Sequence, residues 1–207
     1  PDPRLFRLRR SRPRSDMLEP QFRAILRAGA GGTVRILLPM VSSVGEIRRA
    51  RDILDDAARN LKRRGVAFAD PLPPVGVMIE VPSAALAADS LAQDSDFFAL
   101  GSNDLTMYTL AIDRSDDQVA HLFDQLHPAV LRLIQFSAEA ALRARIPVSI
   151  CGEMAGDPRF TALLLGLGFR ELSMTASSIP RVKKRIREDR KSTRLNSSHV
   201  VISYARF

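Results

Sequence analysis

Two acidic residues lie at or just after the ends of short apolar segments, and carboxylates at such positions can bind ligands or take part in catalysis. Glu80 ends the apolar segment 75–80, and Asp104 lies just after the segment 96–102. The carboxyl ends of parallel strands meet at one side of a sheet, so both carboxylates can enter one cleft. Mg²⁺ takes oxygen ligands and keeps water and substrate phosphate in its other positions. The pair predicts a Mg²⁺ site; the alternative is that each acid caps the helix that follows it.

The single cysteine, Cys151, ends a further apolar segment, 147–151, and opens the motif Cys-Gly-Glu-Met-Ala-Gly-Asp. An unperturbed thiol has a pKa of about 8.5 and is mostly protonated at neutral pH. It can therefore act as a general acid, and its thiolate as a base or nucleophile. Free cysteine is also among the most buried residue types and often only fills a core. From the residue alone, both interpretations stay open.

Arg114 and the three histidines complete the set of residues that could do chemistry. A guanidinium can hold a phosphate or carboxylate through two parallel hydrogen bonds, although a solvated surface arginine is the plainer interpretation of Arg114. His121 has apolar neighbours and is expected to pack among them. His127 precedes Pro128 and is expected at the start of a helix, and His199 belongs to a basic tail. The histidines therefore carry little functional weight.

Short apolar segments must position these residues. Each is too short for a helix and apolar on both faces, as buried parallel strands are. They are 34–39, 75–80, 96–102, 147–151 and 171–175. Helical patterns lie between them. Ser43 and Glu46 form a capping box, and Gly65 fits the end of the helix that this box begins.

Two prolines and an aspartate mark further helix starts. Pro82 and Pro128 suit first helical turns. Asp157 is expected to cap the helical segment that follows it. Strands that alternate with helices indicate an α/β protein with a parallel sheet.

The position of the polar residues distinguishes two architectures, a doubly wound sheet and a (β/α)8 barrel. Polar residues follow several strands, at Glu80, 102–104 and 151–153. A (β/α)8 barrel builds its active site from the carboxyl ends of many strands. We therefore predict a partial (β/α)8 TIM barrel comprising about the last five βα units and incomplete on its N-terminal side.

Composition excludes several classes of protein. Of the 207 residues, 45% are hydrophobic and 26% are charged, which is typical of a globular domain. No apolar run is long enough to span a bilayer. One cysteine cannot form an internal disulfide, so a reducing, cytoplasmic setting is expected. The sequence contains no Walker-type loop, no Gly-x-Gly-x-x-Gly after a strand, no zinc-spaced Cys/His set and no Gly-x-Ser-x-Gly motif.

The net charge of +8 is concentrated at the two ends of the chain. Residues 1–15 hold six Arg and one Asp, and residues 181–207 hold nine Lys or Arg and two acids. The remainder is net acidic. A nucleic-acid-binding module is the alternative that this charge suggests, and it rests on the charge alone.

Several motifs together resemble one family. The segments GVMIEVPSAA, DFFALGSNDLTMYTLAIDR, SICGEMAGDP and ELSMTASSIPRVKKRIR resemble the C-terminal region of Enzyme I of the bacterial phosphotransferase system, a phosphoenolpyruvate–protein phosphotransferase. The resemblance covers about residues 20–187. Pyruvate phosphate dikinase and phosphoenolpyruvate synthase share the SNDLT and CGE patterns. The segment 108–114 and the SIPRVKK ending look more like Enzyme I.

The resemblance implies a (β/α)8 barrel that binds phosphoenolpyruvate and Mg²⁺. Carried onto matching positions, Glu80 and Asp104 would ligate the metal. Asn103, the backbone around Asp104, and Arg114 would hold the phosphate of phosphoenolpyruvate. Cys151 would be the proton donor that converts enolpyruvate to pyruvate. This chemistry fits the residue types, because phosphoryl transfer depends mostly on positioning and charge neutralisation.

The resemblance also implies partners. Enzyme I transfers the phosphoryl group to its own histidine, in a separate domain with a Thr-Ser-His motif that this sequence lacks. A histidine-containing phosphocarrier protein then receives it for sugar uptake. A homodimer is implied, without nucleic-acid or membrane partners. The 207 residues alone are expected to be inactive. Two alternatives stay open: a fragment of the dikinase or synthase, and a non-catalytic, phosphoenolpyruvate-binding regulatory paralogue.

Three regions are expected along the chain. Residues 1–15 form an arginine-rich segment that does not align convincingly, although a family arginine would fall near Arg4 or Arg7. Residues 16–188 form the barrel region. Residues 189–207 resemble a translated sequencing adapter and are expected to have no fixed place. The alternative is a genuine, solvated basic tail.

Overall fold

The computed structural model describes residues 15–192 and 201–204. It divides into two compact units, which are described separately below. Unit 1 comprises residues up to 36 together with 44–75, and unit 2 comprises residues 37–43 and those from 76 onward. The division falls inside the first strand and after the first residue of the second.

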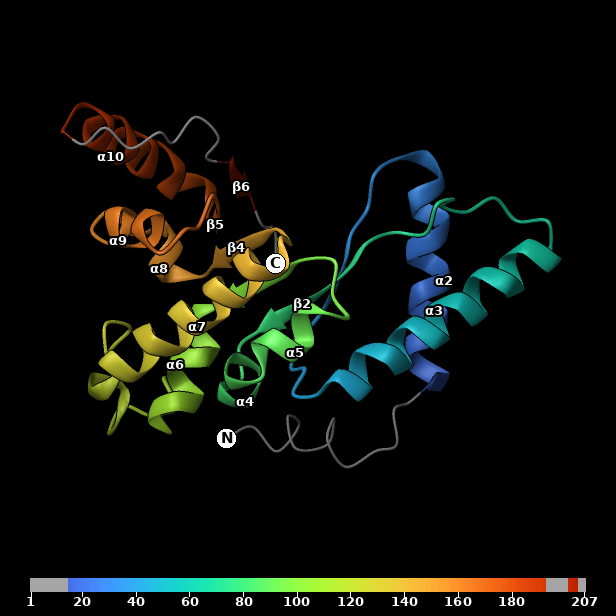
Figure 1. The fold of residues 1–207 in the computed structure, drawn as a ribbon, viewed down its shortest axis with the longest axis horizontal. Coiled ribbons are helices and arrows are strands. Elements are labelled where there is room, and N and C mark those ends of the chain that lie inside the picture. Colours follow the sequence, from blue (N-terminus) through green and yellow to red (C-terminus); the bar gives the residue numbers. More distant parts are fainter. Residues whose placement is uncertain (1–14, 193–200, 205–207) are drawn as a thin grey trace. The chain divides into compact units, whose positions relative to one another are not determined.

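Unit 1 is built on two helices, α2 (Ser15–Ala28) and α3 (Val44–Arg63), with the short 3₁₀ turn η1 (Gly29–Gly31) after α2. The two helices pack on each other, as Figure 1 shows. Each helix turns an apolar stripe inward, and burial of such a stripe stabilises a helix more than propensity does. The buried residues of the two stripes are Phe22 and Leu26 on α2, and Ile47, Ala50, Ile53, Leu54, Ala57, Ala58 and Leu61 on α3.

The limits predicted for the helix after Ser43 are confirmed. Helix α3 begins at Val44, directly after Ser43, and Glu46 lies in its first turn. Gly65 has a positive φ of 64° just past the helix end. Its N–H donates to Lys62 O at 3.1 Å. Gly65 thus ends the helix in the left-handed conformation that glycine adopts most easily.

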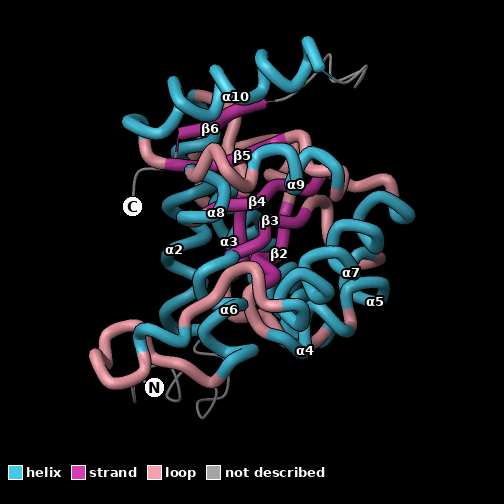
Figure 2. Tube along the Cα trace, turned by 90° about the vertical axis from the view of Figure 1, so that its left-hand side faces the viewer, coloured by secondary structure: helices cyan, strands magenta, loops and turns pink. Residues whose placement is uncertain are grey.

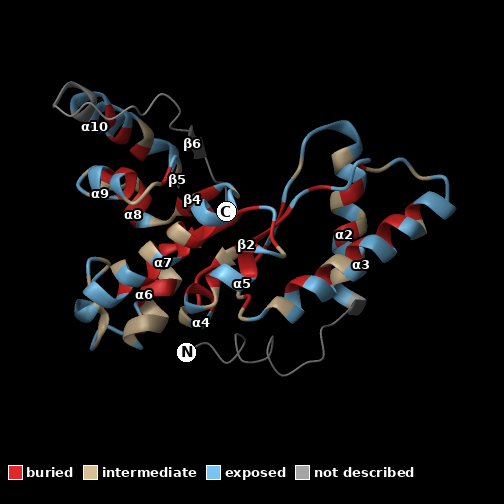
Figure 3. Ribbon diagram, viewed as in Figure 1, coloured by how far each residue is buried: buried red, intermediate tan, exposed pale blue. Residues whose placement is uncertain are grey.

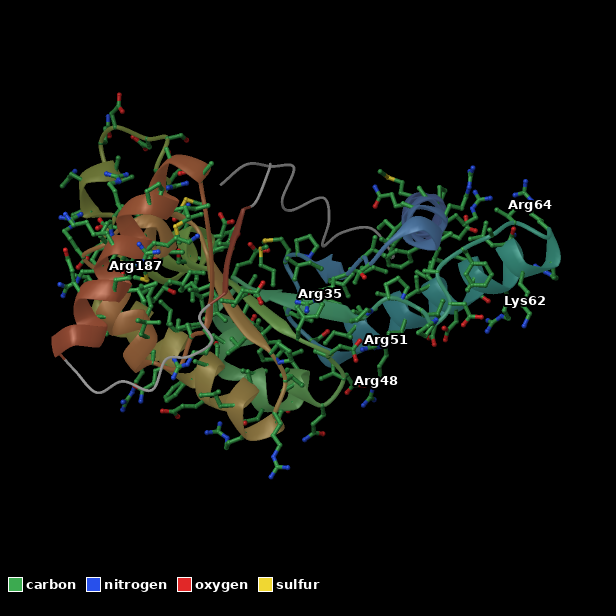
Figure 4. All side chains as sticks on the ribbon, turned by 90° about the horizontal axis from the view of Figure 1, so that it is seen from above. Arg35, Arg48, Arg51, Lys62, Arg64 and Arg187 are labelled. Atoms are coloured by element: carbon green, nitrogen blue, oxygen red, sulfur yellow. The ribbon has the colours of Figure 1, made fainter. Side chains whose placement is uncertain are left out.

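The exposed side of α3 carries charges of both signs. Figure 4 shows the side chains of Arg48, Lys62 and Arg64, which lie on α3 or just after it and are exposed. Asp52 and Asp55 are also exposed on this helix. A helix surface with interleaved charges is an ordinary solvated face, so α3 does not favour the nucleic-acid alternative.

The sheet has the strand order β1-β2-β3-β4-β5-β6, and Figure 2 shows its strands side by side. From β2 to β6, each strand pairs in parallel with the next one. The five predicted strands are confirmed. The bounds are β1 Ile36–Leu38, β2 Val75–Ile79, β3 Phe98–Gly101, β4 Val148–Cys151, β5 Glu171–Met174 and β6 Val201–Tyr204.

Helices follow the strands of unit 2, as in βα units. After β2 come α4 (Pro82–Leu86) and α5 (Ala88–Ala92), and after β3 come α6 (Ser102–Leu110), η2 (Ala120–Leu122) and α7 (Pro128–Ala144). After β4 come α8 (Glu153–Gly156) and α9 (Thr161–Gly166), and after β5 come η3 (Ala176–Ser178) and α10 (Ile179–Ser192). The α/β class with a parallel sheet is therefore confirmed.

Three of the predicted helix starts can be compared with the structure. Pro82 and Pro128 occupy the first turns of α4 and α7, as predicted. His127 caps α7, because its Nδ1 accepts a hydrogen bond from Ala129 N at 3.2 Å. The prediction for Asp157 is wrong. Its carboxylate accepts from Arg159 N at 2.9 Å in a local turn, and α9 begins only at Thr161.

The core of unit 2 lies between the sheet and its helices. All four residues of β3 are buried, and Figure 3 shows buried residues along the central strands. Phe98, Leu100 and Ile150 are fully buried on β3 and β4, and Ile134 is fully buried on α7, which packs against both strands. Burying side chains of this size contributes roughly 1.5–3 kcal/mol each. This burial holds the carboxyl ends of β2, β3 and β4 in place.

The C-terminal tail differs from expectation at two segments, although residues 189–207 were expected to have no fixed place. Helix α10 continues to Ser192, and Val201–Tyr204 forms β6 and pairs in parallel with β5. The β6 segment is rich in residues of high strand propensity, and β5 offers it an edge with unpaired N–H and C=O groups. Residues 193–200 and 205–207 lie outside the described part of the chain, so the adapter interpretation stays a prediction.

Candidate functional site

The carboxyl ends of three neighbouring strands bring the predicted residues together in unit 2. Glu80 directly follows β2, and Cys151 is the last residue of β4. Between them, β3 ends at Gly101, and Asn103 and Asp104 lie in the first turn of α6. The register of β3 and β4 places Gly101 opposite Cys151. The sheet therefore fixes the spacing of these groups.

Gly101 allows the close approach of β2 and β3 at this point. A Cβ atom added to Gly101 would lie 3.0 Å from both Cβ and Oε2 of Glu80, and 3.3 Å from Sδ of Met78. Contacts this short are tighter than real Cβ atoms normally make. The absence of a side chain at position 101 therefore leaves the space that the Glu80 carboxyl occupies.

Glu80 is a buried acid with a strongly perturbed pKa. Its side chain is only 3% exposed, and its Oε1 accepts a hydrogen bond from Met40 N at 2.7 Å. Burial, and then the charge and hydrogen bonding of the neighbouring Asp104 carboxyl, raise the pKa of Glu80 from 4.5 to about 7. The Met40 N–H acts in the opposite direction. Glu80 and Asp104 thus form a pair of neighbouring carboxyl groups and, in the part of the chain that the structure describes, no basic side chain is among the groups that shift the pKa of Glu80.

The helix-capping alternative for the two acids is wrong. The N-cap of α4 is Val81, and the N-cap of α6 is Gly101, and neither helix has a side-chain capping hydrogen bond. Asp104 lies inside the first turn of α6, where a negative charge suits the helix dipole. Neither carboxylate is therefore used as the N-cap that the alternative required.

The pair provides the donor atoms that a hard cation prefers. Two carboxylates lie together at the carboxyl edge of a sheet, and a divalent cation would neutralise the charge that raises the pKa of Glu80. Among the described residues there is no cluster of three or more His, Cys, Asp or Glu side chains suited to a metal ion.

Cys151 is a half-buried thiol beside this pair. Its Sγ donates to Leu100 O at 3.3 Å, and its own carbonyl accepts from Ser102 Oγ at 2.9 Å. Burial, and then the charges of Glu80 and Asp104, raise the pKa of Cys151 to about 11. The thiol is therefore neutral over the whole physiological range, as a proton donor requires.

A second group of residues surrounds Asn103 at the rim of the site. Asn103 Oδ1 accepts from Gln125 Nε2 at 3.0 Å and from Glu153 N at 3.4 Å. Arg114 Nη1 donates to Glu153 Oε1 at 2.9 Å, and its guanidinium lies over the Phe123 ring, 5.2 Å from the centroid. The structure thus links Arg114 to Asn103 through Glu153.

Gly152 is required where the rim meets β4. Its φ is +105°, which L side chains rarely adopt. A Cβ at this position would lie 2.7 Å from Ser102 Oγ and 3.1 Å from Asn103 Oδ1. The glycine of the Cys-Gly-Glu motif therefore lets the chain pass close beneath Asn103.

A cavity of about 620 Å³ opens beside the rim. Asn103, Gly152 and Glu153 form one part of its lining. The rest comes from the segments after β4 and β5, with Asp157 and Arg159 ion-paired at 2.6 Å. A ligand that contacts Asn103 therefore has access from solvent.

Three residues of the site were not predicted from the sequence, and the environment of one histidine was predicted wrongly. The three residues are Gln125, Glu153 and Phe123. The Cys-Gly-Glu motif contained Glu153, but no sequence signal pointed to Gln125. The packing role expected for His121 is wrong, because it lies exposed in the one-turn helix η2. His199, like Arg4 and Arg7, lies outside the residues that the structure describes.

The site lies at the carboxyl ends of a parallel sheet, and this sequence can be compared with known families. The sequence model described as "PEP-utilising enzyme, PEP-binding domain", where PEP is phosphoenolpyruvate, matches residues 4–191. The chain belongs to this family. The match begins before the boundary expected at residue 16.

The curated relatives narrow the comparison. The chain is 51% identical over 170 residues to the phosphoenolpyruvate-protein phosphotransferase of Cupriavidus necator, covering 82% of this chain and 29% of the relative. It is 45% identical over 174 residues to the protein of that name from Haemophilus influenzae, covering 84% and 30%. The chain spans about 30% of the length of these relatives.

Solved structures show the fold. A citrate lyase from Burkholderia xenovorans aligns with a TM-score of 0.60 at 18% identity, covering 87% of this chain and 62% of that one. A HpcH/HpaI aldolase/citrate lyase family protein from Burkholderia cenocepacia aligns with a TM-score of 0.51 at 17% identity, covering 81% and 68%. The predicted partial (β/α)8 barrel is confirmed. In the described residues, no helix has the length and apolar character needed to cross a membrane.

Proposed function

We propose that this chain is the phosphoenolpyruvate-binding and catalytic part of a phosphoenolpyruvate–protein phosphotransferase. One observation carries the proposal: a thiol held in its neutral form lies beside a pair of carboxyl groups, one of them buried, in a domain of the PEP-binding family. The names of the two curated relatives support this function over the dikinase and synthase alternatives.

Asn103 and Arg114 bind the phosphate group, together with the backbone around Asp104. A guanidinium has five N–H donors, and the contact between Arg114 Nη1 and Glu153 uses only one nitrogen. The remaining donors are free to form charge-assisted hydrogen bonds with phosphate oxygens. Asn103 adds a neutral donor at the neighbouring position. The rim thus orients the ligand while Glu80, Asp104 and Cys151 contact its reacting end.

Glu80 and Asp104 would hold Mg²⁺. When bound, the ion would neutralise the negative charge of the phosphate and of the enolate oxygen. The carboxyl pair supports this role, because its two acids lie close enough together to raise the pKa of Glu80. In the absence of a cation, the pair keeps a proton on Glu80 at and below neutral pH.

Cys151 supplies the proton that completes the reaction. The bond between the enol oxygen and phosphorus breaks, and the phosphoryl group passes to a histidine nitrogen. The enolate that remains takes the Sγ proton of Cys151 on its methylene carbon and becomes pyruvate. The thiolate then takes a proton from water. In reverse, the thiolate removes a methyl proton from pyruvate.

The acceptor histidine and the later steps involve other parts of the system. The phosphoryl group passes from that histidine to a histidine-containing phosphocarrier protein, in sugar uptake. In its full-length form the protein would be a cytoplasmic homodimer. These assignments come from the resemblance to Enzyme I, and the names of the curated relatives support the phosphotransferase activity alone.

Binding of phosphoenolpyruvate by the 207-residue chain tests the proposal. Isothermal titration calorimetry with phosphoenolpyruvate, in the presence of Mg²⁺ and after chelation with EDTA, should give binding that depends on the ion. Asp89→Asn is a matched control, because Asp89 is an exposed acid paired with Arg143. It should bind like wild type. Absence of binding with Mg²⁺, in a chain whose cooperative unfolding shows that it is folded, would contradict the proposal.

A further inference from the structure

The amide of Asn103 can present two different atoms to a ligand. Its oxygen accepts hydrogen bonds and its NH₂ group donates them. A phosphate group without bound protons only accepts, so it is held by the nitrogen and repelled by the oxygen. The orientation of this amide therefore decides whether Asn103 contributes to binding.

Two donors determine the orientation of this amide. Gln125 Nε2 lies 3.0 Å from Asn103 Oδ1, and Glu153 N lies 3.4 Å from the same atom. A side-chain amide can rotate, but a backbone N–H is always a donor. If the Asn103 amide turned over, its NH₂ group would face the N–H of Glu153. The backbone N–H of Glu153 thus fixes the side of the Asn103 amide on which the oxygen lies. Gln125 donates the shorter of the two hydrogen bonds to that oxygen.

Gln125 reaches Asn103 from a segment that is itself well ordered by hydrogen bonds. It lies between η2 and α7, and its neighbour Leu126 donates its N–H to Asp124 Oδ1 at 2.8 Å. His127 N donates to Asp124 O at 3.2 Å, directly before α7 begins. The Gln125 side chain is half-buried. The same connection between α6 and α7 carries Arg114, so one segment provides both an anion-binding residue and a partner for Asn103.

We infer that Gln125 is a positioning residue, which holds the Asn103 amide with its oxygen occupied and its nitrogen left for the phosphate group of the ligand. The identity of that ligand rests on the proposed function. Gln125 contacts Asn103 and acts only through it. Its loss should therefore weaken phosphate binding without removing any group that contacts the phosphate.

The first experiment is made without ligand. In ¹H–¹⁵N spectra of the 207-residue chain, Gln125→Met should shift the side-chain NH₂ signals of Asn103 and the backbone amide signal of Glu153. Gln118→Met is the matched control, because Gln118 is an exposed glutamine on the same segment. Its substitution should leave both signals in place. If Gln125→Met leaves them unchanged as well, the inference is wrong.

The second experiment measures affinity for phosphoenolpyruvate with Mg²⁺ by calorimetry. Loss of one neutral hydrogen bond predicts about a threefold to tenfold weaker Kd for Gln125→Met. Gln125→Glu should weaken it more, because an acceptor at this position draws the NH₂ group of Asn103 toward itself. Gln118→Glu introduces the same charge on the same segment and should change Kd by less than about twofold.

A double-mutant cycle separates positioning from a general structural effect. In an Asn103→Ala background, Gln125→Met should change Kd by less than about twofold, because its only route to the ligand is gone. If the same threefold to tenfold loss persists in that background, the inference is wrong. If the spectra show the coupling but wild type binds no phosphoenolpyruvate, the proposed function fails and the inferred orientation of Asn103 stands.

Discussion

The site of unit 2 has two parts that are held by different kinds of contact. We call the deeper part, with Glu80, Asp104 and Cys151, the pole, and the exposed part around Asn103 and Arg114 the rim. At the buried pole, the groups of Glu80 and Cys151 contact backbone atoms, Met40 N and Leu100 O. At the rim, Asn103 and Arg114 contact residues from distant segments, chiefly Gln125 and Glu153. The pole is fixed by the sheet, whereas the rim is fixed by side chains and connecting segments.

This difference matches the chemistry proposed for each part. Proton transfer depends on pKa values, and burial moves those of Glu80 and Cys151 upward by raising the free energy of their charged forms. Anion binding needs access and several directed donors, and a solvent-facing rim provides both. Substitutions at the pole should therefore change metal-dependent binding, chemistry and stability, whereas substitutions at the rim should change affinity with little effect on stability.

The largest effect is expected at Asp104. Asp104→Asn removes one of the two carboxylates proposed to hold Mg²⁺ and keeps the size of the side chain. Binding of phosphoenolpyruvate in the presence of Mg²⁺ should weaken at least about 100-fold, because removing one of two charged partners of a cation costs roughly 3 kcal/mol or more. Calorimetry provides the measurement. A Kd within threefold of wild type would show that the pole does not carry the metal.

Gly152 connects the pole to the rim, and replacing it should be costly. Gly152→Ala forces a side chain into a φ of +105° and to 2.7 Å from Ser102 Oγ. Strain of this kind costs about 1–3 kcal/mol, and the steric overlap adds to it. Urea unfolding should show a loss of about 2–4 kcal/mol.

Gly166 offers the matched control for this substitution. It ends α9, and an added Cβ would meet nothing within 4 Å. Gly166→Ala should leave the free energy of unfolding unchanged or raise it by up to about 1 kcal/mol. Equal losses for the two alanine variants would mean that the close approach at Gly152 does not exist.

The buried pole should also give the chain a characteristic pH dependence. The pKa of Glu80 is raised from 4.5 to about 7. Between these values the folded chain keeps a proton that the unfolded chain releases, so the free energy of unfolding falls as pH rises from 4.5 to 7. The shift corresponds to about 3–4 kcal/mol at most.

Glu80→Gln isolates this contribution, because it removes the ionisable group and keeps an acceptor for Met40 N. Measured by urea unfolding in EDTA, wild type should lose about 2–3 kcal/mol more than Glu80→Gln between pH 4.5 and pH 8. Parallel pH profiles for the two proteins would contradict a raised pKa of Glu80.

The smallest effect on stability is expected at the rim. Arg114 and Glu153 form an ion pair whose side chains are 37% and 68% exposed. Exposed pairs contribute about 0–1 kcal/mol. Glu153→Gln should therefore change the free energy of unfolding by less than about 1 kcal/mol, as measured in urea. A loss as large as that of Gly152→Ala would mean that the rim is structural and would remove the contrast with the pole.

The same contrast explains how much the sequence could predict. The five strands, the ends of α3 and the positions of Glu80, Asp104 and Cys151 depend on local apolar runs and on parallel pairing. Those features are visible in the sequence, and the structure agrees with them. Strand β6 escaped prediction because its segment was interpreted as part of an adapter-like tail, although its pairing with β5 resembles that of the other strands.

The rim could not be predicted to the same depth. Gln125 contacts Asn103, which lies 22 positions earlier, and no spacing rule connects the two. Asp157 misled the prediction because its carboxylate satisfies a local turn at Arg159 N instead of the helix that starts later. The raised pKa values of Glu80 and Cys151 depend on burial, which only the folded chain reveals.

The exchange of pyruvate methyl protons tests the central claim most directly, since it needs the pole but no phosphoryl acceptor. Because the 207 residues alone are expected to be inactive, pyruvate is incubated in D₂O with Mg²⁺ and a full-length protein that contains them, and deuterium incorporation is followed by ¹H NMR. The account predicts exchange that depends on Mg²⁺ and falls at least about 100-fold in Cys151→Ser, as expected for loss of a general acid–base group. Exchange at the wild-type rate in Cys151→Ser would contradict the role of Cys151 as the proton donor.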